Sequence, residues 1–543
     1  MSSFSPEAAP GSRPLASGPL FLLSIFGVFV LANFWLRISF LVNEPFNLDE
    51  AHGAVTAVEI LNGGIPYRDL VIHRGPLTDY FFAAVFSLFE PYNYAWIHGA
   101  LCLAMALAAA MIYFLGRILS GHTAGLFGGL IFSAAAFFGN SWETLAFHTE
   151  HTMILFTLPA ALVFITSLRE FRAGPSMACG ALLGLAFFSK QPAIMDLGAM
   201  LLFLAVLAIL QPGQAGRFAG KAVWLMAGFL AVTLSGVSFF WNRGALAEFY
   251  HYFFGFNLGP YFSAIAWKER LSNSLGYPFL ASGMYAMNPW VLPLALVYAG
   301  GFLVRKFGRS GSRLETAFVM LWALMAYAGA SLSGRNFGHY HFQELPAVCL
   351  LAGLAMERLF AFGQKRLGKK AMVTIALVLW VSFLTMLSVS LQRQTRPLLD
   401  PAVKDAAGEI NLRSSGSDRI FVWGVVPEIY GWAKRRPASR FGVANFLTGL
   451  IPWANTGPEE DTTSKIEPGA WGIFMSEMAL NRPLYIVDTS PGDIRYYKKY
   501  PPEEFPALRA LLEKEYFLEK TVLFSAGPAA GTPLIRLYRR RNA

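Results

Sequence analysis

The chain has 543 residues, of which 55% are hydrophobic and only 14% are charged, so it is too apolar for a soluble protein of several domains. Its formal net charge of +10 comes from lysines and arginines that recur between apolar stretches. This pattern is typical of membrane topology and does not indicate a nucleic-acid partner.

Apolar windows long enough to cross a bilayer, about 20 residues each, recur along the first 391 residues. The first window is too long for the core of a signal peptide and lacks a small-residue cleavage site, so it is expected to be retained. Residues 1–18 are expected to form a flexible cytoplasmic tail. The sequence predicts eleven spans within a membrane domain of residues 19–391, near 19–42, 94–116, 122–139, 150–168, 176–194, 196–211, 221–241, 288–304, 314–332, 345–360 and 371–391.

Basic residues set the orientation of these spans. They gather in alternate loops, near residues 117, 169–172, 217–221, 305–313 and 358–370. By the positive-inside rule these loops are cytoplasmic. The first long loop, residues 43–93, is then extracytoplasmic, as are residues 392–543. We expect a multi-pass protein of the bacterial inner membrane that faces the periplasm with these two segments.

Residues 392–543 differ in composition from the rest. They contain strand-like runs at 419–426, 482–489 and 532–539 and a helix-like run at 505–516, a pattern typical of a small α/β domain. The three cysteines of the chain all lie in predicted spans, so no disulfide framework is expected. The predicted fold class is an α-helical polytopic membrane protein with a C-terminal extracytoplasmic α/β domain.

Polar side chains collect in the loops that are predicted to be extracytoplasmic. The stretch FNLDEAHG introduces two adjacent acids just after the first span, and three later loops read NSWETLAFHTEH, FFSKQPAIMD and SGRNFGHYHFQELP. Chemistry is therefore expected on that side of the membrane. The candidate residues are Asp49, Glu50, His52, Arg74, His148, Glu150, His151, Lys190, Arg335, His339, Tyr340, His341 and Gln343.

The order of these features resembles a known family. FNLDEAHGAVTAVEILNGGIPYRDLVIHRGPL, GLAFFSKQPA, GRNFGHYHFQELPA and the later DRIFVWG follow one another as in the GT-C membrane glycosyltransferases. Within them the chain is similar to glycosyltransferase family 39, the bacterial relatives of dolichyl-phosphate-mannose protein mannosyltransferase and of lipid A aminoarabinose transferase. The resemblance implies inverting transfer of a sugar from a polyprenyl-phosphate donor to a hydroxyl of a lipid, glycan or protein. It also implies a catalytic acid in the first outer loop, here Asp49 with Glu50 in support.

The residue chemistry agrees with such a reaction. A hydroxyl acceptor is a weak nucleophile, so a carboxylate such as that of Asp49 is needed to take its proton. Cations stabilise a departing phosphate, and Lys190 and Arg335 are the candidates because each follows a span on the outer side. The sugar arrives activated on a lipid, so no nucleotide site is needed, and no cofactor is expected.

Each assignment has a structural alternative. Asp49 is equally suited to cap the helix that follows it. Lys190 is long enough to extend from a helix end to the headgroups, and Arg335 is near enough in sequence to pair with Glu344. His148, Glu150 and His151 are possible ligands of a divalent metal, but their spacing favours the lining of a substrate pocket instead. Pocket lining is also expected for His52, Arg74, His339, Tyr340, His341 and Gln343.

The aromatic run at 250–262 predicts either an amphipathic helix in the membrane interface or one wall of a groove for the lipid donor. Two other functions remain open at this point. A lipid or glycan transporter or flippase requires charged groups near the middle of several spans. A membrane assembly protein whose C-terminal domain does the work does not require the first loop.

Overall fold

The computed structural model describes residues 18–139, 141–279, 288–304, 312–393 and 399–541. The predicted tail and part of one predicted basic loop, 305–311, thus lie outside the described residues. The chain forms two compact units. The first consists of Met1–Leu41, His98–Gly236 and Lys268–Gln394, and the second of Val42–Ile97, Val237–Trp267 and Thr395–Ala543. The polar segment after the first span therefore belongs to the same unit as the C-terminal residues.

Helices make up the first unit. In order they are α1 (Pro19–Arg37), η1 (Ile38–Phe40), α4 (Tyr94–Leu119), α5 (His122–Ala135), α6 (Ser141–Thr144), α7 (Thr149–Thr166), α8 (Ala173–Ser189), η2 (Gln191–Ala193), α9 (Ile194–Leu210), η3 (Pro212–Gln214), α10 (Ala215–Asn242), α12 (Trp267–Gly276), η5 (Tyr277–Phe279), α14 (Val291–Leu303), α15 (Arg313–Ser331), η7 (Gly338–Phe342) and α16 (Leu345–Arg393). The last few residues of α10 and the first of α4 and α12 extend into the second unit.

Seven helical stretches among the described residues are long and apolar enough to cross a membrane. They are Pro19–Phe40, Tyr94–Leu119, Thr149–Thr166, Gln191–Leu210, Pro212–Asn242, Arg313–Ser331 and Leu345–Gly368. The shorter apolar helices α5, α8 and α14 coincide with three further predicted spans. The expected polytopic helical fold is confirmed, and the chain is a multi-pass membrane protein.

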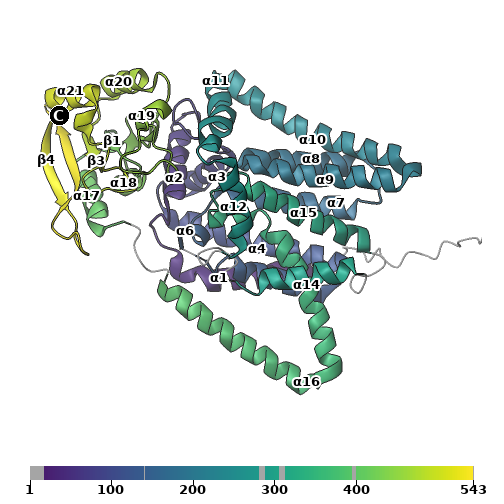
Figure 1. Ribbon diagram of the computed structural model, residues 1–543. Coiled ribbons are helices and arrows are strands. Elements are labelled where there is room, and N and C mark those ends of the chain that lie inside the picture. Colours follow the sequence, from purple (N-terminus) through teal and green to yellow (C-terminus); the bar gives the residue numbers. More distant parts are fainter. Residues whose placement is uncertain (1–17, 140, 280–287, 305–311, 394–398, 542–543) are drawn as a thin grey trace, which may run out of the picture. The chain divides into compact units, whose positions relative to one another are not determined.

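The last predicted span, 371–391, is part of α16. This long helix is bent at Gly368, where φ is 73° and ψ is 167° (Figure 1). A residue with a Cβ atom rarely adopts such a conformation, so glycine permits the bend. The bend falls in the predicted basic loop and divides the helix into two limbs, as the sequence pattern indicated.

Helices α7 to α10 run alongside one another in Figure 1, and small residues bring α8 and α10 into contact. A Cβ atom on Gly180 would lie 1.8 Å from the carbonyl oxygen of Leu225, and one on Gly228 would lie 2.0 Å from that of Met177. Without Cβ atoms the two backbones approach closely, which is how helices pack tightly in lipid.

The second unit combines helices with a five-stranded sheet. Its helices are α2 (Leu48–Leu61), α3 (Leu77–Leu88), α11 (Leu246–Tyr250), η4 (His251–Tyr261), α17 (Pro401–Leu412), α18 (Glu428–Ala433), α19 (Asn445–Thr448), η8 (Thr463–Lys465), α20 (Ala470–Asn481), η9 (Pro502–Glu504) and α21 (Pro506–Glu515). Its strands are β1 (Arg419–Trp423), β2 (Arg436–Pro437), β3 (Tyr485–Asp488), β4 (Tyr516–Leu523) and β5 (Pro533–Arg540).

The strand order is β2-β1-β3-β5-β4. Strands β2, β1 and β3 are parallel, whereas β5 runs antiparallel to both β3 and β4. Strands β1, β3 and β5 and helix α21 match the predicted elements, so the expected C-terminal α/β fold is confirmed. Sequence analysis missed β2, which has two residues, and β4, an edge strand whose Glu519 and Lys520 interrupt the apolar pattern.

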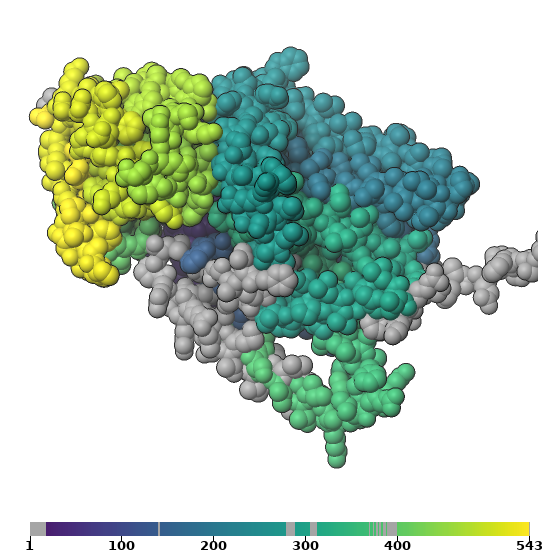
Figure 2. Space-filling model, viewed as in Figure 1, coloured from purple at the N-terminus to yellow at the C-terminus, as the bar shows by residue number. Residues whose placement is uncertain are grey.

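The aromatic run at 250–262 belongs to the second unit, where Tyr252, Phe253 and Phe256 are buried. The ring of Phe249 stacks on Phe240 with centroids 4.5 Å apart, and Phe256 contacts Phe446 at 5.3 Å. His251 Nε2 lies 2.8 Å from Glu467 of the C-terminal segment. Figure 2 shows this teal segment against the lime C-terminal residues. These contacts join three distant parts of the sequence in one unit.

Candidate functional site

Helix α2 begins with a polar turn that leaves one acid accessible. Asn47 is the N-cap, and its side-chain oxygen accepts a hydrogen bond from Glu50 N at 2.8 Å. Glu50 is buried, and its Oε2 accepts from Phe46 N at 2.8 Å, so each of the two side chains satisfies an otherwise unpaired backbone amide. The alternative in which Asp49 caps the helix is wrong, because Asn47 performs that role. The side chain of Asp49 is 48% exposed.

Arg74 connects Asp49 with a second, buried acid. Its Nη2 lies 2.9 Å from Oδ1 of Asp79, whose side chain is fully buried, and its Nη1 donates to the carbonyl oxygen of Asp49 at 3.0 Å. The same Nη1 is 3.6 Å from Oδ1 of Asp49. Burial raises the pKa of Asp79 to about 6 although Arg74 acts in the opposite direction. Arg74 therefore supports the backbone that carries Asp49 and places a positive charge beside its carboxylate.

His52 lies on α2 one turn after Asp49. Burial, together with the nearby Arg74 and His73, lowers the pKa of His52 to about 3. Its imidazole is therefore neutral at physiological pH. Among the described residues its buried Nε2 has no hydrogen-bond partner. A neutral ring with a free nitrogen is suited to contact a polar, uncharged group such as a sugar hydroxyl.

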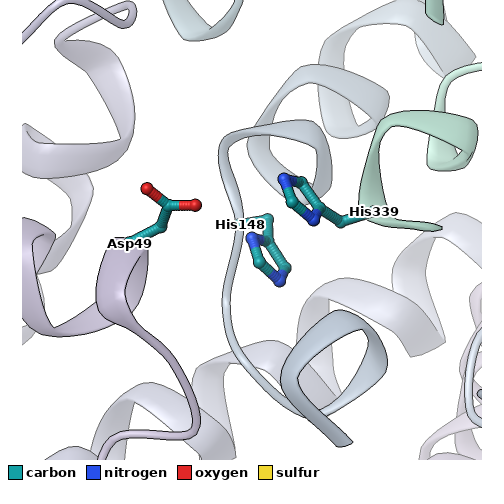
Figure 3. A group of neighbouring side chains, drawn as sticks. All are labelled: Asp49, His148 and His339. Carbon is teal, nitrogen blue, oxygen red and sulfur yellow. The ribbon is translucent and has the colours of Figure 1, made fainter. Parts of the chain in front are cut away.

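In the first unit, two of the predicted histidines lie together. The rings of His148 and His339 stack with centroids 3.9 Å apart. Figure 3 labels both histidines, and it also draws Asp49 at the start of α2. His148 is the N-cap residue of α7, and its Nε2 lies 2.9 Å from the carbonyl oxygen of Trp142. His339 is in η7, so the stack joins two loops that are far apart in sequence.

Glu143 holds His339 in this position. Its Oε2 accepts from the backbone N of His339 at 2.7 Å and also contacts Nδ1 of the ring. Burial acts to raise the pKa of Glu143, but His339 outweighs it and the pKa falls to about 2. Burial opposes the charge of His339, yet Glu143 and Glu150 raise its pKa above the usual value. The contact thus favours the ionised form of Glu143 and the protonated form of His339.

Lys190 lies at the end of α8 and is turned toward the protein. Its Nζ pairs with Oε1 of Glu150, which is 1% exposed, and lies 3.6 Å from the centroid of the Tyr340 ring. The Lys190 side chain is itself only 15% exposed. The alternative in which Lys190 extends to the headgroups is therefore wrong. Lys190, Glu150 and Tyr340 form one group that brings together three loops of the sequence.

Of the remaining predicted residues, His151 and His341 are fully buried, and Arg335 lies in a loop. His151 Nδ1 accepts from the backbone N of His148 at 2.9 Å, which fixes the start of α7. His341 is fully buried, stacks on Tyr277 at 3.5 Å and pairs with Oε1 of Glu344 at 2.7 Å. Glu344, the sequence partner suggested for Arg335, is thus engaged by His341. Arg335 itself is half-buried in the loop before η7.

Asp196 was missed by the sequence analysis. This fully buried acid in α9 accepts from Trp322 Nε1 at 2.6 Å and from Gln343 Nε2 at 2.7 Å. Gln343 also donates to the carbonyl oxygen of Pro192 at 2.9 Å. The network ties the loop that carries His339 to the turn that follows Lys190. The signal that could have found it is an acid in the first turn of an apolar helix.

Comparisons with known proteins bear on the fold. A family model described as dolichyl-phosphate-mannose-protein mannosyltransferase matches residues 73–241, which include Arg74, His148 and Lys190. A search of curated proteins gave no match. ArnT from Cupriavidus metallidurans, solved with bound undecaprenyl phosphate, is similar with a TM-score of 0.59 and 14% identity over 96% of this chain and 98% of that one.

The archaeal oligosaccharyltransferase AglB from Archaeoglobus fulgidus, solved with an inhibitory peptide and a dolichol-phosphate, is also similar. Its TM-score is 0.55 at 12% identity, over 96% of this chain and 74% of that one. At such identities the likeness shows the fold. The predicted resemblance to the GT-C membrane glycosyltransferases is confirmed at that level.

Proposed function

We propose that the chain is a membrane glycosyltransferase that moves a sugar from a polyprenyl-phosphate donor to a hydroxyl on a lipid, glycan or protein. The acceptor oxygen attacks the anomeric carbon, the bond from that carbon to the phosphate oxygen breaks, and polyprenyl phosphate leaves. The acceptor proton passes to Asp49. One displacement inverts the anomeric configuration. The reaction takes place on the extracytoplasmic side, in the bacterial inner membrane.

The observation that carries this proposal is the state of Asp49. The capping of α2 by Asn47 leaves its carboxylate half-exposed, and Arg74 holds its backbone in place. A general base must be accessible to the acceptor and ionised at the working pH. The guanidinium of Arg74 lies 3.6 Å from the carboxylate. Glu50, buried in the cap, acts by fixing this turn.

The donor phosphate needs a positive partner, and Lys190 and Arg335 remain the proposed pair. Lys190 is desolvated and lies on the face of Tyr340, where a positive charge interacts strongly with an anion. In the ligand-free protein Glu150 balances this charge, so phosphate binding requires the Lys190–Glu150 contact to loosen. The two similar structures contain a bound dolichol-phosphate and undecaprenyl phosphate, which supports a lipid-phosphate donor here.

The transporter alternative is less well supported. Its charged groups are expected to line a path within the spans. Asp196 lies in the first turn of α9, near one end of a span, and its two oxygens accept hydrogen bonds from Trp322 and Gln343. A closed network of this kind stabilises the helix packing, so it favours a fixed scaffold over a moving ion path.

The test is sugar transfer by the purified chain in nanodiscs. A panel of polyprenyl-phosphate sugars is offered with extracted membrane acceptors, and Asp49→Asn is compared with the wild type. Removing a general base is expected to reduce turnover by about 100-fold or more. Glu44→Gln is the matched control, because Glu44 precedes α2 in the same segment and its side chain is also 48% exposed.

Two outcomes would contradict the assignment. If Asp49→Asn is as active as Glu44→Gln, Asp49 is not the base. If no donor on the panel is consumed by the wild type, the transferase proposal itself fails. Since no metal is expected to take part, a parallel reaction with a chelator should proceed at an unchanged rate.

A further inference from the structure

The second unit contains a groove of about 640 Å³ at the amino ends of its parallel strands. This volume is in the range of small-molecule sites, about 300–1,000 Å³. The groove lies where α17 ends, β3 begins and β5 ends, on the C-terminal segment alone. It is lined by Leu412, Arg413, Ser414, Ser415, Asp418, Arg482, Leu484, Arg539 and Arg540.

Four of the nine lining residues are arginines, and only Asp418 is acidic. The carboxylate of Asp418 already accepts from the backbone N and the hydroxyl of Ser415, at 2.7 and 3.0 Å. It therefore stabilises the turn before β1, and its single negative charge does not balance four arginines. The groove has an excess of positive charge.

The arginines differ in their partners. Arg413 and Arg539 share Glu519, at 3.7 and 3.1 Å. In the described part of the chain, neither Arg482 nor Arg540 lies within ion-pair distance of an acid. Arg482 is exposed and Arg540 is half-exposed. Two of the arginines that line the groove are thus without an acidic partner among the described residues.

The carboxyl end of α17, beside the groove, would repel an anion, but an arginine offsets its partial negative charge. The carboxyl end of α17 carries unpaired carbonyl groups and the negative end of the helix dipole. Arg435 donates to the carbonyl oxygens of Asn411 and Ser414 at 2.9 and 2.6 Å and to the hydroxyl of Ser414 at 2.8 Å. This fifth arginine neutralises the helix end beside the groove.

We propose that this groove binds a phosphate monoester, with Arg482 and Arg540 as its principal contacts. Guanidinium groups present paired donors that match phosphate oxygens. Leu412, 87% exposed, and Leu484 add an apolar wall, so the phosphate is attached to a larger body such as a sugar or a lipid. This site is separate from Asp49 and does not depend on the proposed transfer reaction.

The experiment measures binding to the purified full-length chain in nonionic detergent. Glucose 1-phosphate is titrated by calorimetry with glucose as its phosphate-free control. Dioctanoyl phosphatidic acid is titrated by native mass spectrometry with dioctanoylglycerol as its control. The first arm reports a water-soluble source of the phosphate and the second a lipid source.

The variants are Arg482→Gln and Arg540→Gln, with Arg509→Gln as the matched control. Arg509 is an exposed arginine on α21 that does not line the groove, so its loss changes the net charge equally. We expect each groove variant to weaken binding by about 10- to 100-fold, the effect of one charge-assisted hydrogen-bonding partner. Arg509→Gln should bind as the wild type does.

Loss of binding in the groove variants supports the proposal in whichever arm it is seen, and that arm identifies the source. Absence of binding by the wild type in both arms overturns it, as does equal binding by all three variants. Wild-type binding must also weaken as NaCl rises from 50 to 500 mM, because partly exposed charges are screened by salt. Binding that ignores salt would also overturn the proposal, even if a variant failed to fold.

Discussion

Glu143→Gln tests the ion pair that holds His339 in the stack with His148. The side chains of Glu143 and His339 are 12% and 10% exposed, so solvent screens their interaction little. The pKa of Glu143 falls from 4.5 to about 2 in the folded protein. A difference of this size corresponds to about 3 kcal/mol between the ionised and protonated forms. We expect the substitution to lower the free energy of unfolding by up to about that amount.

The effect should depend on pH in a defined direction. The contribution of Glu143 is complete above its unfolded pKa near 4.5 and is lost as the pH falls toward 2. The pKa of His339 is raised, so its contribution is complete below its unfolded value near 6.5 and is lost as the pH rises through the folded pKa. Glu143→Gln should therefore cost most between these two values and less at pH 9.

The assay is thermal unfolding in nonionic detergent at pH 5.5 and pH 9, followed by intrinsic fluorescence. Glu170→Gln is the control, because Glu170 is an exposed acid of the same unit, 3.9 Å from Arg172, whose loss should have little effect. An equal loss of stability at both pH values would refute the argument. So would a loss at pH 5.5 no greater than that of the control.

Three further pairs of substitutions test single sites. Glu59→Gln breaks the fork to Arg436, at 2.7 and 2.6 Å, and should destabilise the second unit by about 2–3 kcal/mol in thermal unfolding, with Arg436→Gln giving a similar loss. Asp196→Leu leaves an indole N–H and a side-chain amide without their acceptor, so it should cost about 2–3 kcal/mol and more than Asp196→Asn, measured in the same way. Gly449→Ala would place a Cβ atom 2.0 Å from a carbonyl oxygen at a φ of 72°, so it should lower the stability by more than about 2 kcal/mol. Gly527→Ala has a similar φ of 81° but no atom within 4 Å, so it should lower the stability by only about 1 kcal/mol. Limited proteolysis of the C-terminal segment measures both.

The membrane spans were predictable from the sequence because the bilayer imposes a length on every apolar helix. The strands β1 and β3 were predictable because they are buried apolar runs, and Ile420 to Trp423 are all buried. The strand β4 was not, since its burial varies along an exposed edge. Its adjacent Glu519 and Lys520 instead continue the mixture of charged and apolar residues that is typical of α21.

The site was only partly predictable, because its contacts join residues that are far apart in sequence. Sequence patterns drew attention to acids and histidines in several loops, but did not pair Glu143 with His339 or Glu150 with Lys190. Local rules also misled at the start of α2. Asp49 and Asn47 are both good N-cap residues, and only the backbone geometry shows that Asn47, with its extended φ of −159°, is the cap.

The second unit also gives the C-terminal domain a role in supporting the candidate base. Arg436 donates two hydrogen bonds to the carboxylate of Glu59 near the carboxyl end of α2. The backbone N of Val71 donates to the carbonyl oxygen of Arg440 at 2.8 Å. The segment that carries Asp49 is thus fixed to the C-terminal segment by hydrogen bonds at Glu59 and at Val71. An assembly protein that works only through its C-terminal domain has no need of these contacts. A transferase does, because a base contributes to catalysis only when its position is held before the substrate arrives.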